Sequence, residues 1–78
     1  MKILLQDMRT GLYFRSLDAW TNSIVDAHDF KFSDKAITYA VEHHIPDVQI
    51  VMVFRESGHV ETVPFPKQLS NSFTHQSK

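Results

Sequence analysis

The strongest constraint on the fold comes from residues 33–54, where an amphipathic helix pattern runs into a strongly apolar strand pattern. Ser33 is a suitable N-cap, because its hydroxyl can accept a bond from an unpaired amide. The predicted core face of the helix repeats at the i, i+3, i+4, i+7 spacing: Ile37, Ala40, Val41 and His44. Pro46 disfavours a helical residue before it, so the helix is predicted to end near His44. A helix and a strand joined by so short a break must lie antiparallel and pack together.

The strand that follows is the most apolar segment of the chain. Residues 48–55 carry apolar side chains on both faces, which is typical of a central strand. Ser57 and Gly58 then turn the chain into a last strand over residues 59–64. A turn of two or four residues would place Val53 opposite Thr62, and a three-residue loop would reverse this face assignment.

The N-terminal part predicts a hairpin. Residues 3–6 and 12–15 read as strands, with Gly11 providing a positive φ in the turn between them. Trp20 is predicted to tuck against this hairpin, and Thr21 to cap a short helical turn over residues 22–28. Two alternating aromatic residues then suggest an extended link with both rings inward, Phe30 and Phe32.

These patterns predict one α+β domain over residues 1–65 with the element order β-β-α-β-β. The four-stranded sheet is expected to be mostly antiparallel, with one main helix on one face. A strand order of 2-1-3-4 keeps hairpin partners adjacent and the third strand central. Residues 66–78 have no periodicity and many small polar side chains, so we expect a flexible tail.

Composition narrows the ways in which so short a chain can be stabilised. The 78 residues allow one small core, and chains below about 80 residues usually gain support from disulfides, a metal or self-association. Cysteine is absent, which excludes disulfides and thiolate metal sites. We therefore expect self-association or a protein partner to stabilise the fold.

Charge and hydropathy exclude two classes of partner. The formal net charge is −1 and the eight Lys and Arg residues are scattered, so we expect no binding to nucleic acid or to a membrane. The apolar residues 3–5 are fewer than the roughly 7–15 that a signal peptide needs. A cytoplasmic location is the resulting expectation.

Four landmarks follow one another in the first half of the chain: Gly11-Leu12-Tyr13-Phe14, Trp20-Thr21, Asp26-Ala27-His28-Asp29-Phe30 and Ala36. In this order they resemble those of small uncharacterised bacterial α+β domains, a group with no assigned activity. The resemblance covers roughly residues 3–65. It implies a hairpin, a short turn, a helix and a second hairpin, and it implies no catalytic or binding residue.

The five histidines are candidate metal ligands. His43 and His44 lie at the predicted helix end, far from His59, so they cannot share one ion with it. His28 and His59 could approach each other, with Asp26 or Asp29 as an oxygen ligand. No recognisable ligand spacing supports such a site, so we expect no metal and no cofactor.

Catalysis is not expected. Ser23, Asp26 and His28 have the residue types of a hydrolase triad, but they lie too close in sequence to reproduce its geometry. The acidic residues are explained by capping and solvation. The sequence therefore predicts that the protein is not an enzyme.

The distinctive surface is the sheet face opposite the helix. Apolar side chains are expected to gather there in larger number than a monomer usually exposes. The candidate interaction residues are Leu4, Tyr13, Trp20, Val51, Val53 and Val60. This face could instead be covered by Trp20 and its loop, or by the tail through Leu69 and Phe73. We expect a non-catalytic protein-interaction module that self-associates, and as the alternative a small-ligand or metal-binding domain at the His28/His59 end.

Overall fold

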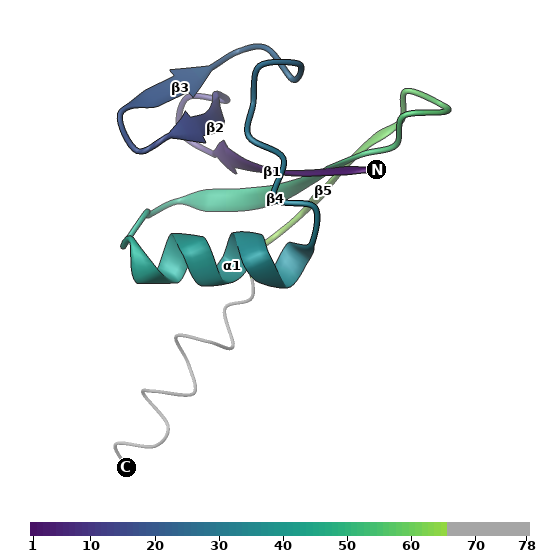
Figure 1. Cartoon of the computed structure of the whole chain (residues 1–78). Helices are drawn as coiled ribbons and strands as arrows, with labels where there is room; N and C mark the ends of the chain where they lie inside the picture. The colour runs from purple at the N-terminus through teal and green to yellow at the C-terminus, as the bar shows by residue number, and fades with distance from the viewer. Residues whose placement is uncertain (66–78) are drawn as a thin grey trace.

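A computed structural model of the chain describes residues 1–65. Within this part, one helix lies against one face of a five-stranded antiparallel sheet (Figure 1). The elements in chain order are β1 (Lys2–Asp7), β2 (Tyr13–Ser16), β3 (Ala19–Thr21), α1 (Ser33–Glu42), β4 (Val48–Val53) and β5 (Val60–Val63). The α+β class with one main helix is confirmed. The predicted tail, with Leu69 and Phe73, lies outside the described residues.

The number of strands differs from the prediction, because residues 19–21 form a short strand where a loop was expected. The strand order is β3-β2-β1-β4-β5, so the order predicted for the other four strands is correct and β3 is added at one edge. Ser16 and Asp18 close the tight turn before it through a 3.0 Å hydrogen bond between their side chains. Trp20 packs edge-on against Phe14 at a centroid distance of 5.5 Å. This cross-strand aromatic contact explains why so short a strand forms.

The predicted face assignment of the last hairpin is correct, although the predicted partner of Val53 is wrong. Val53 lies opposite Val60, not Thr62, and Thr62 lies opposite Val51. The connection holds the six residues 54–59, in which Gly58 adopts a positive φ of 70°. Six is an even number, so the same side chains share a face as for a shorter even turn.

The ends of α1 are fixed by the backbone. Phe32 occupies the N-cap without any side-chain hydrogen bond, so the prediction that Ser33 caps the helix is wrong: Ser33 is the first helical residue. At the other end His44 has a positive φ of 54°, and the N–H groups of His44 and Ile45 donate to Val41 and Ala40. This is the Schellman pattern, in which a left-handed residue ends the helix.

The buried face of α1 is rotated from the predicted one. Ala36 and Ala40 are buried against the sheet, whereas Val41 is 47% exposed and His44 is exposed. Two alanines at the centre of the contact let the helix approach β1 and β4 closely, and Tyr39 then reaches an aromatic cluster at the side. The prediction that Val41 and His44 belong to the core face is therefore wrong.

An aromatic cluster fills the space between α1 and the β2 side of the sheet. Phe14 lies at its centre, with ring centroids of Phe30 at 5.9 Å and Tyr39 at 5.3 Å. Phe14 is 3% exposed and Phe30 is 9% exposed, while Phe32 is 62% exposed. Only one of the two rings predicted to point inward does so. Phe32 stands at the helix N-cap, where its ring leaves the core.

Along part of β1, the segment before the helix provides the hydrogen bonds that a neighbouring strand would otherwise make. Beyond the single β1–β2 pair at Gln6 and Tyr13, the N–H of Phe30 donates to the carbonyl of Ile3 at 2.8 Å. Asp29 completes the connection, because its Oδ1 accepts the N–H of Ile3 at 3.0 Å and that of Lys31 at 2.8 Å. The backbone of β1 is thus satisfied where β2 no longer lies beside it.

The carboxyl of Asp29 is therefore a structural acceptor. Its burial opposes ionisation, but the N–H donors of Ile3 and Lys31 and the positive charges of Lys2 and Arg55 outweigh that effect. Together they hold the pKa of Asp29 below its ordinary value of 3.8. A lowered folded-state pKa means that the ionised form stabilises the fold.

We expect Asp29→Ala to lower the free energy of unfolding by about 2 kcal/mol at neutral pH, because the buried N–H of Ile3 loses its acceptor. The gap between the two proteins should be complete above the ordinary pKa of 3.8 and shrink as the pH falls through the lowered folded-state pKa. Urea unfolding at a series of pH values measures it. Asp26→Ala, which removes an exposed carboxylate from the same segment, is the control. Equal losses for the two variants would contradict the role of Asp29.

Candidate interaction surface

The sheet face opposite α1 collects the residues predicted to form an interaction surface, with one exception. The pairs Leu4 with Val51 and Val53 with Val60 place these four side chains on this face, and Tyr13 packs beside them. We call it the second face. Trp20 is elsewhere, packed against the cluster on the helix side.

Part of the second face is covered by the chain itself. Leu4 and Val51 have no exposed surface, because Ile24 and Ala27 of the segment between β3 and α1 pack on them. Figure 1 shows this segment rising on the side of the sheet opposite α1 and then crossing to the helix. Within residues 1–65 the cover is therefore this segment and not Trp20, whereas the tail, the other possibility that the sequence left open, lies outside the described residues.

Hydrogen bonds shape the covering segment into a single turn. Thr21 Oγ1 accepts the N–H of Ser23 at 3.0 Å, and the carbonyl of Ser23 accepts the N–H of Ala27 at 3.1 Å. Lys2 Nζ reaches across from β1 to the carbonyl of Ile24 at 3.3 Å. The sequence did carry this signal, since Ile24 and Ala27 are spaced to share one side of a helical turn.

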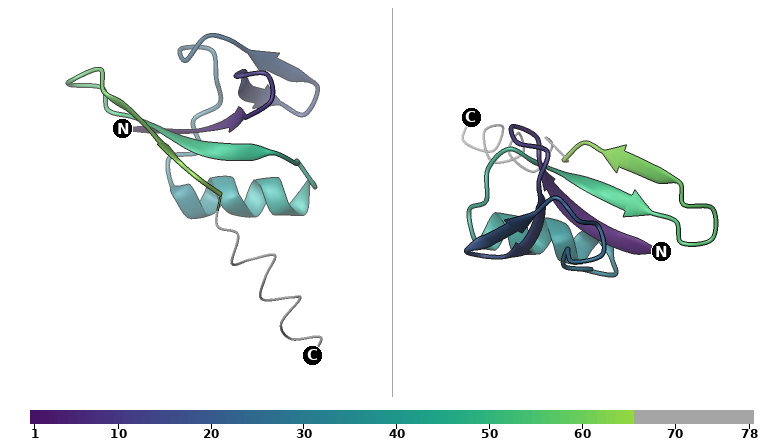
Figure 2. Two further views of the ribbon diagram at one scale, coloured as in Figure 1. Left: turned by 180° about the vertical axis from the view of Figure 1, so that it is seen from behind. Right: turned by 90° about the horizontal axis from the view of Figure 1, so that it is seen from above.

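The exposed remainder of the second face lies toward β5. Tyr13 and Val53 are half-buried at the margin of the cover, and Val60 is 39% exposed. All four residues of β5 are exposed, and β5 is the last strand of the sheet. Figure 2 shows β5 at the rim of the molecule in the view from above. Of the predicted surface, the part around Val60 is therefore the part that a partner could reach.

The two histidines of the alternative hypothesis have different neighbours. The ring of His28 contacts that of Phe30 at a centroid distance of 4.5 Å. The ring of His59 lies 5.8 Å from that of Phe54 between centroids, and its Nε2 lies 3.8 Å from a carboxylate oxygen of Glu61. Among residues 1–65, no three His, Asp or Glu side chains gather in a way that could hold a metal ion.

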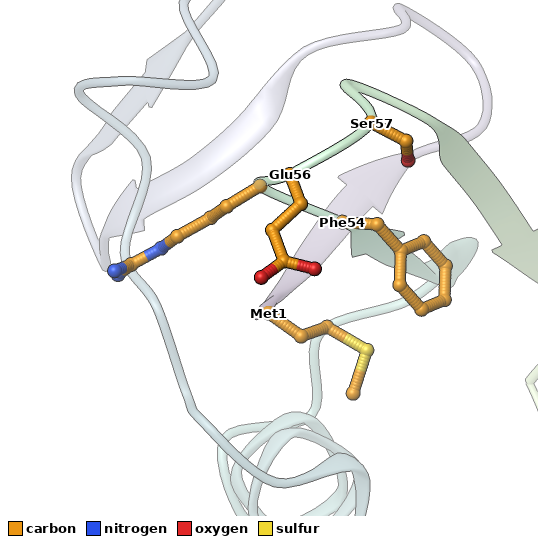
Figure 3. A pocket seen from close by; sticks show the side chains of 5 residues that line it. Met1, Phe54, Glu56 and Ser57 are labelled. Carbon is orange, nitrogen blue, oxygen red and sulfur yellow. The ribbon is translucent and has the colours of Figure 1, made fainter.

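A hollow of about 490 Å³ opens beside the loop that joins β4 and β5 (Figure 3). Its lining consists of Met1, Phe54, Arg55, Glu56 and Ser57. Figure 3 shows the side chains of Met1, Phe54 and Glu56 directed toward this space. Arg55, Glu56 and Ser57 are exposed, so the hollow is an open recess. It does not provide the enclosed environment in which acid–base catalysis is tuned.

Comparison of the chain with protein-family models, curated proteins and solved structures finds no match. No helix among the described residues is long and apolar enough to cross a membrane.

Proposed function

We propose that the protein is a non-catalytic protein-interaction module that self-associates through the exposed end of the second face. The observation that carries the proposal is the position of β5. It is an edge strand of the described sheet whose side chains are all exposed, and it lies next to an apolar face that residues 1–65 cover only in part. Exposed edge strands and apolar patches are surfaces that other chains bind.

Two features of the chain favour a second copy as the partner. A chain of 78 residues without cysteine buries little surface by itself, and self-association adds to the buried area. A two-fold dimer also pairs identical patches, so an apolar Val60 on one copy meets an apolar Val60 on the other when the axis passes beside it. Two copies of the surface around Val60 would therefore be complementary to each other.

We expect the unaltered chain to show a mass near twice its 9.1 kDa in light scattering at micromolar concentration. Val60→Lys should shift it toward the monomer, because a lysine at an apolar contact would be left without a partner charge. Val63→Lys is the control, since Val63 lies on the same strand with 40% exposure against 39% for Val60, but faces the helix side. A monomeric mass for the unaltered chain across that range would overturn self-association.

A further inference from the structure

The helix side of β5 is left uncovered within residues 1–65. α1 packs on β1 and β4 but not on β5. Val63 lies opposite Ile50, which is buried together with Ala36 and Ala40 of the helix. Residues directly opposite each other in an antiparallel pair share one face of the sheet, so Val63 is on the helix side. It is 40% exposed there, which leaves an apolar side chain of β5 open to solvent beside the helix.

One flank of α1 borders the same space. Ala36 and Ala40 face the sheet, and Tyr39 packs at the β2 side of it. Successive helical residues are about 100° apart, which places Ile37 and Val41 on the opposite flank, toward β5. Ile37 is half-buried and Val41 is 47% exposed. We call the surface formed by Ile37, Val41 and Val63 the α1–β5 flank.

The described part of the chain ends at this flank. Phe65 is half-buried and packs against the cluster between the sheet and α1, as Ile37 and Met52 do. Figure 1 shows β5 running toward α1 and ending at its level. Residues 66–78 follow Phe65 directly, so they begin on the helix side of the sheet.

We propose that residues 66–78 bind to the α1–β5 flank of their own chain through the side chains of Leu69 and Phe73. These two residues are four apart, a spacing that puts both on one side of a helix and also on one side of a strand. Four residues span at most about 14 Å and eight at most about 28 Å, while α1 is about 15 Å long, so both side chains can reach the flank from Phe65. The flexible tail expected from the sequence would then be held at two points.

The charges of the segment and of the flank are complementary. Residues 66–78 contain Lys67 and Lys78 and no acidic residue. Two exposed carboxylates border the flank: Asp34, one turn before its apolar helix residues, and Glu61, which lies on the helix side of β5 opposite Met52. Exposed ion pairs contribute little free energy, so the apolar contact supplies the binding and the charges favour this occupant.

The second face is the other apolar surface near the end of β5. Phe65 packs on the helix side, so the segment would have to pass around the edge of β5 to reach Val60. Ile24 and Ala27 already cover part of that face. The α1–β5 flank is therefore the surface assigned to residues 66–78. This assignment does not depend on the proposed self-association, which uses the opposite side of the sheet.

Cleavage by chymotrypsin after Phe73 tests the assignment, because a bound segment is cut only in the molecules in which it is released. Val63→Lys puts a charge into the flank and should speed this cleavage at least about threefold, measured by mass spectrometry. Val60→Lys is the matched control, since Val60 lies on the same strand with 39% exposure but on the second face. It should leave the rate unchanged. Equal rates for the two variants would overturn the proposal, and faster cleavage of Val60→Lys alone would place the segment on the second face.

A double-mutant cycle gives a second measurement. Val41→Ser and Phe73→Ser should each lower the melting temperature by about 4 °C, and the double variant should lose less than the sum, because either change removes the same contact. Leu17→Ser, at a 58% exposed side chain between β2 and β3, should be additive with Phe73→Ser.

Additive losses for Val41→Ser and Phe73→Ser would contradict the contact between these two residues. A loss that disappears on dilution would assign the flank to the segment of another copy and overturn binding within one chain. The mass in light scattering, which tests the proposed function, is independent of both results.

Discussion

Phe14→Ala is expected to unfold the protein or to leave it barely folded. The side chain is 3% exposed and contacts the rings of Trp20, Phe30 and Tyr39. Removing a buried phenylalanine costs about 3–5 kcal/mol, and each lost aromatic pair adds about 0.5–1.5 kcal/mol. A domain of 78 residues has a total stability of only about 4–12 kcal/mol. Urea unfolding followed by Trp20 fluorescence measures the loss.

Phe32→Ala removes the same atoms from a side chain that is 62% exposed, and it is the control for this prediction. We expect it to change the free energy of unfolding by less than about 0.5 kcal/mol. Comparable losses for the two variants would show that Phe14 is not the centre of the aromatic cluster. They would also show that the ring of Phe32 contacts the core in solution.

Leu4→Ala is the second large effect, with an expected loss of about 3–4 kcal/mol. Leu4 has no exposed surface. It packs with its cross-strand neighbour Val51 and with Ala27 of the covering segment. The truncation leaves a cavity under that segment, so the loss should appear at every protein concentration. Thermal unfolding over a range of concentrations measures it.

Leu17→Ala, at a side chain that is 58% exposed, should be silent in the same experiment. The concentration dependence distinguishes a core residue from an interface residue. A loss of stability for Leu4→Ala that disappears at low concentration would assign Leu4 to the dimer contact. The structure instead makes it part of the monomer core.

Phe14 and Leu4 belong to different buried clusters of one small protein. Phe14 belongs to the cluster between the sheet and α1, and Leu4 to the cluster between the sheet and the covering segment. Leu4 and Val51, two of the residues predicted for interaction, are thus buried within the chain. The proposed partner copy would reach the strand that the covering segment does not cover, which is β5.

The buried face of the helix could not be predicted from the spacing of its apolar residues alone. Ile37, Ala40 and Val41 satisfy the spacing of a core face, and so do Ala36, Ala40 and Ile37. The choice between the two depends on how closely the helix approaches the sheet. The alanines are the buried residues because their small side chains permit a close approach of the helix to the sheet. Tyr39 then fills the space beside Phe14. Val41 is left at the surface.

The sequence by itself determined the helix and the two hairpins, but not β3 or the partner of Val53. Period-two apolar runs and the turns at Gly11 and Gly58 define the two hairpins, and the break at Pro46 fixes the antiparallel helix and strand. These are local signals, since each depends on residues close together in the chain. Hairpin partners must be neighbours, but the pairing of β1 with β4, which joins the two hairpins, connects segments far apart in the chain.

Only the tertiary structure decided which residues cover the second face. Ile24 and Ala27 lie more than twenty residues from Val51, and Asp29 reaches the backbone of Ile3 across a similar separation. Such contacts depend on the path of the whole chain, which a local pattern does not encode. The same long-range packing buries Leu4 and leaves Val60 exposed, although both are apolar strand residues on one face. The candidate surface could therefore be predicted as a face from the sequence, but its accessible part only from the fold.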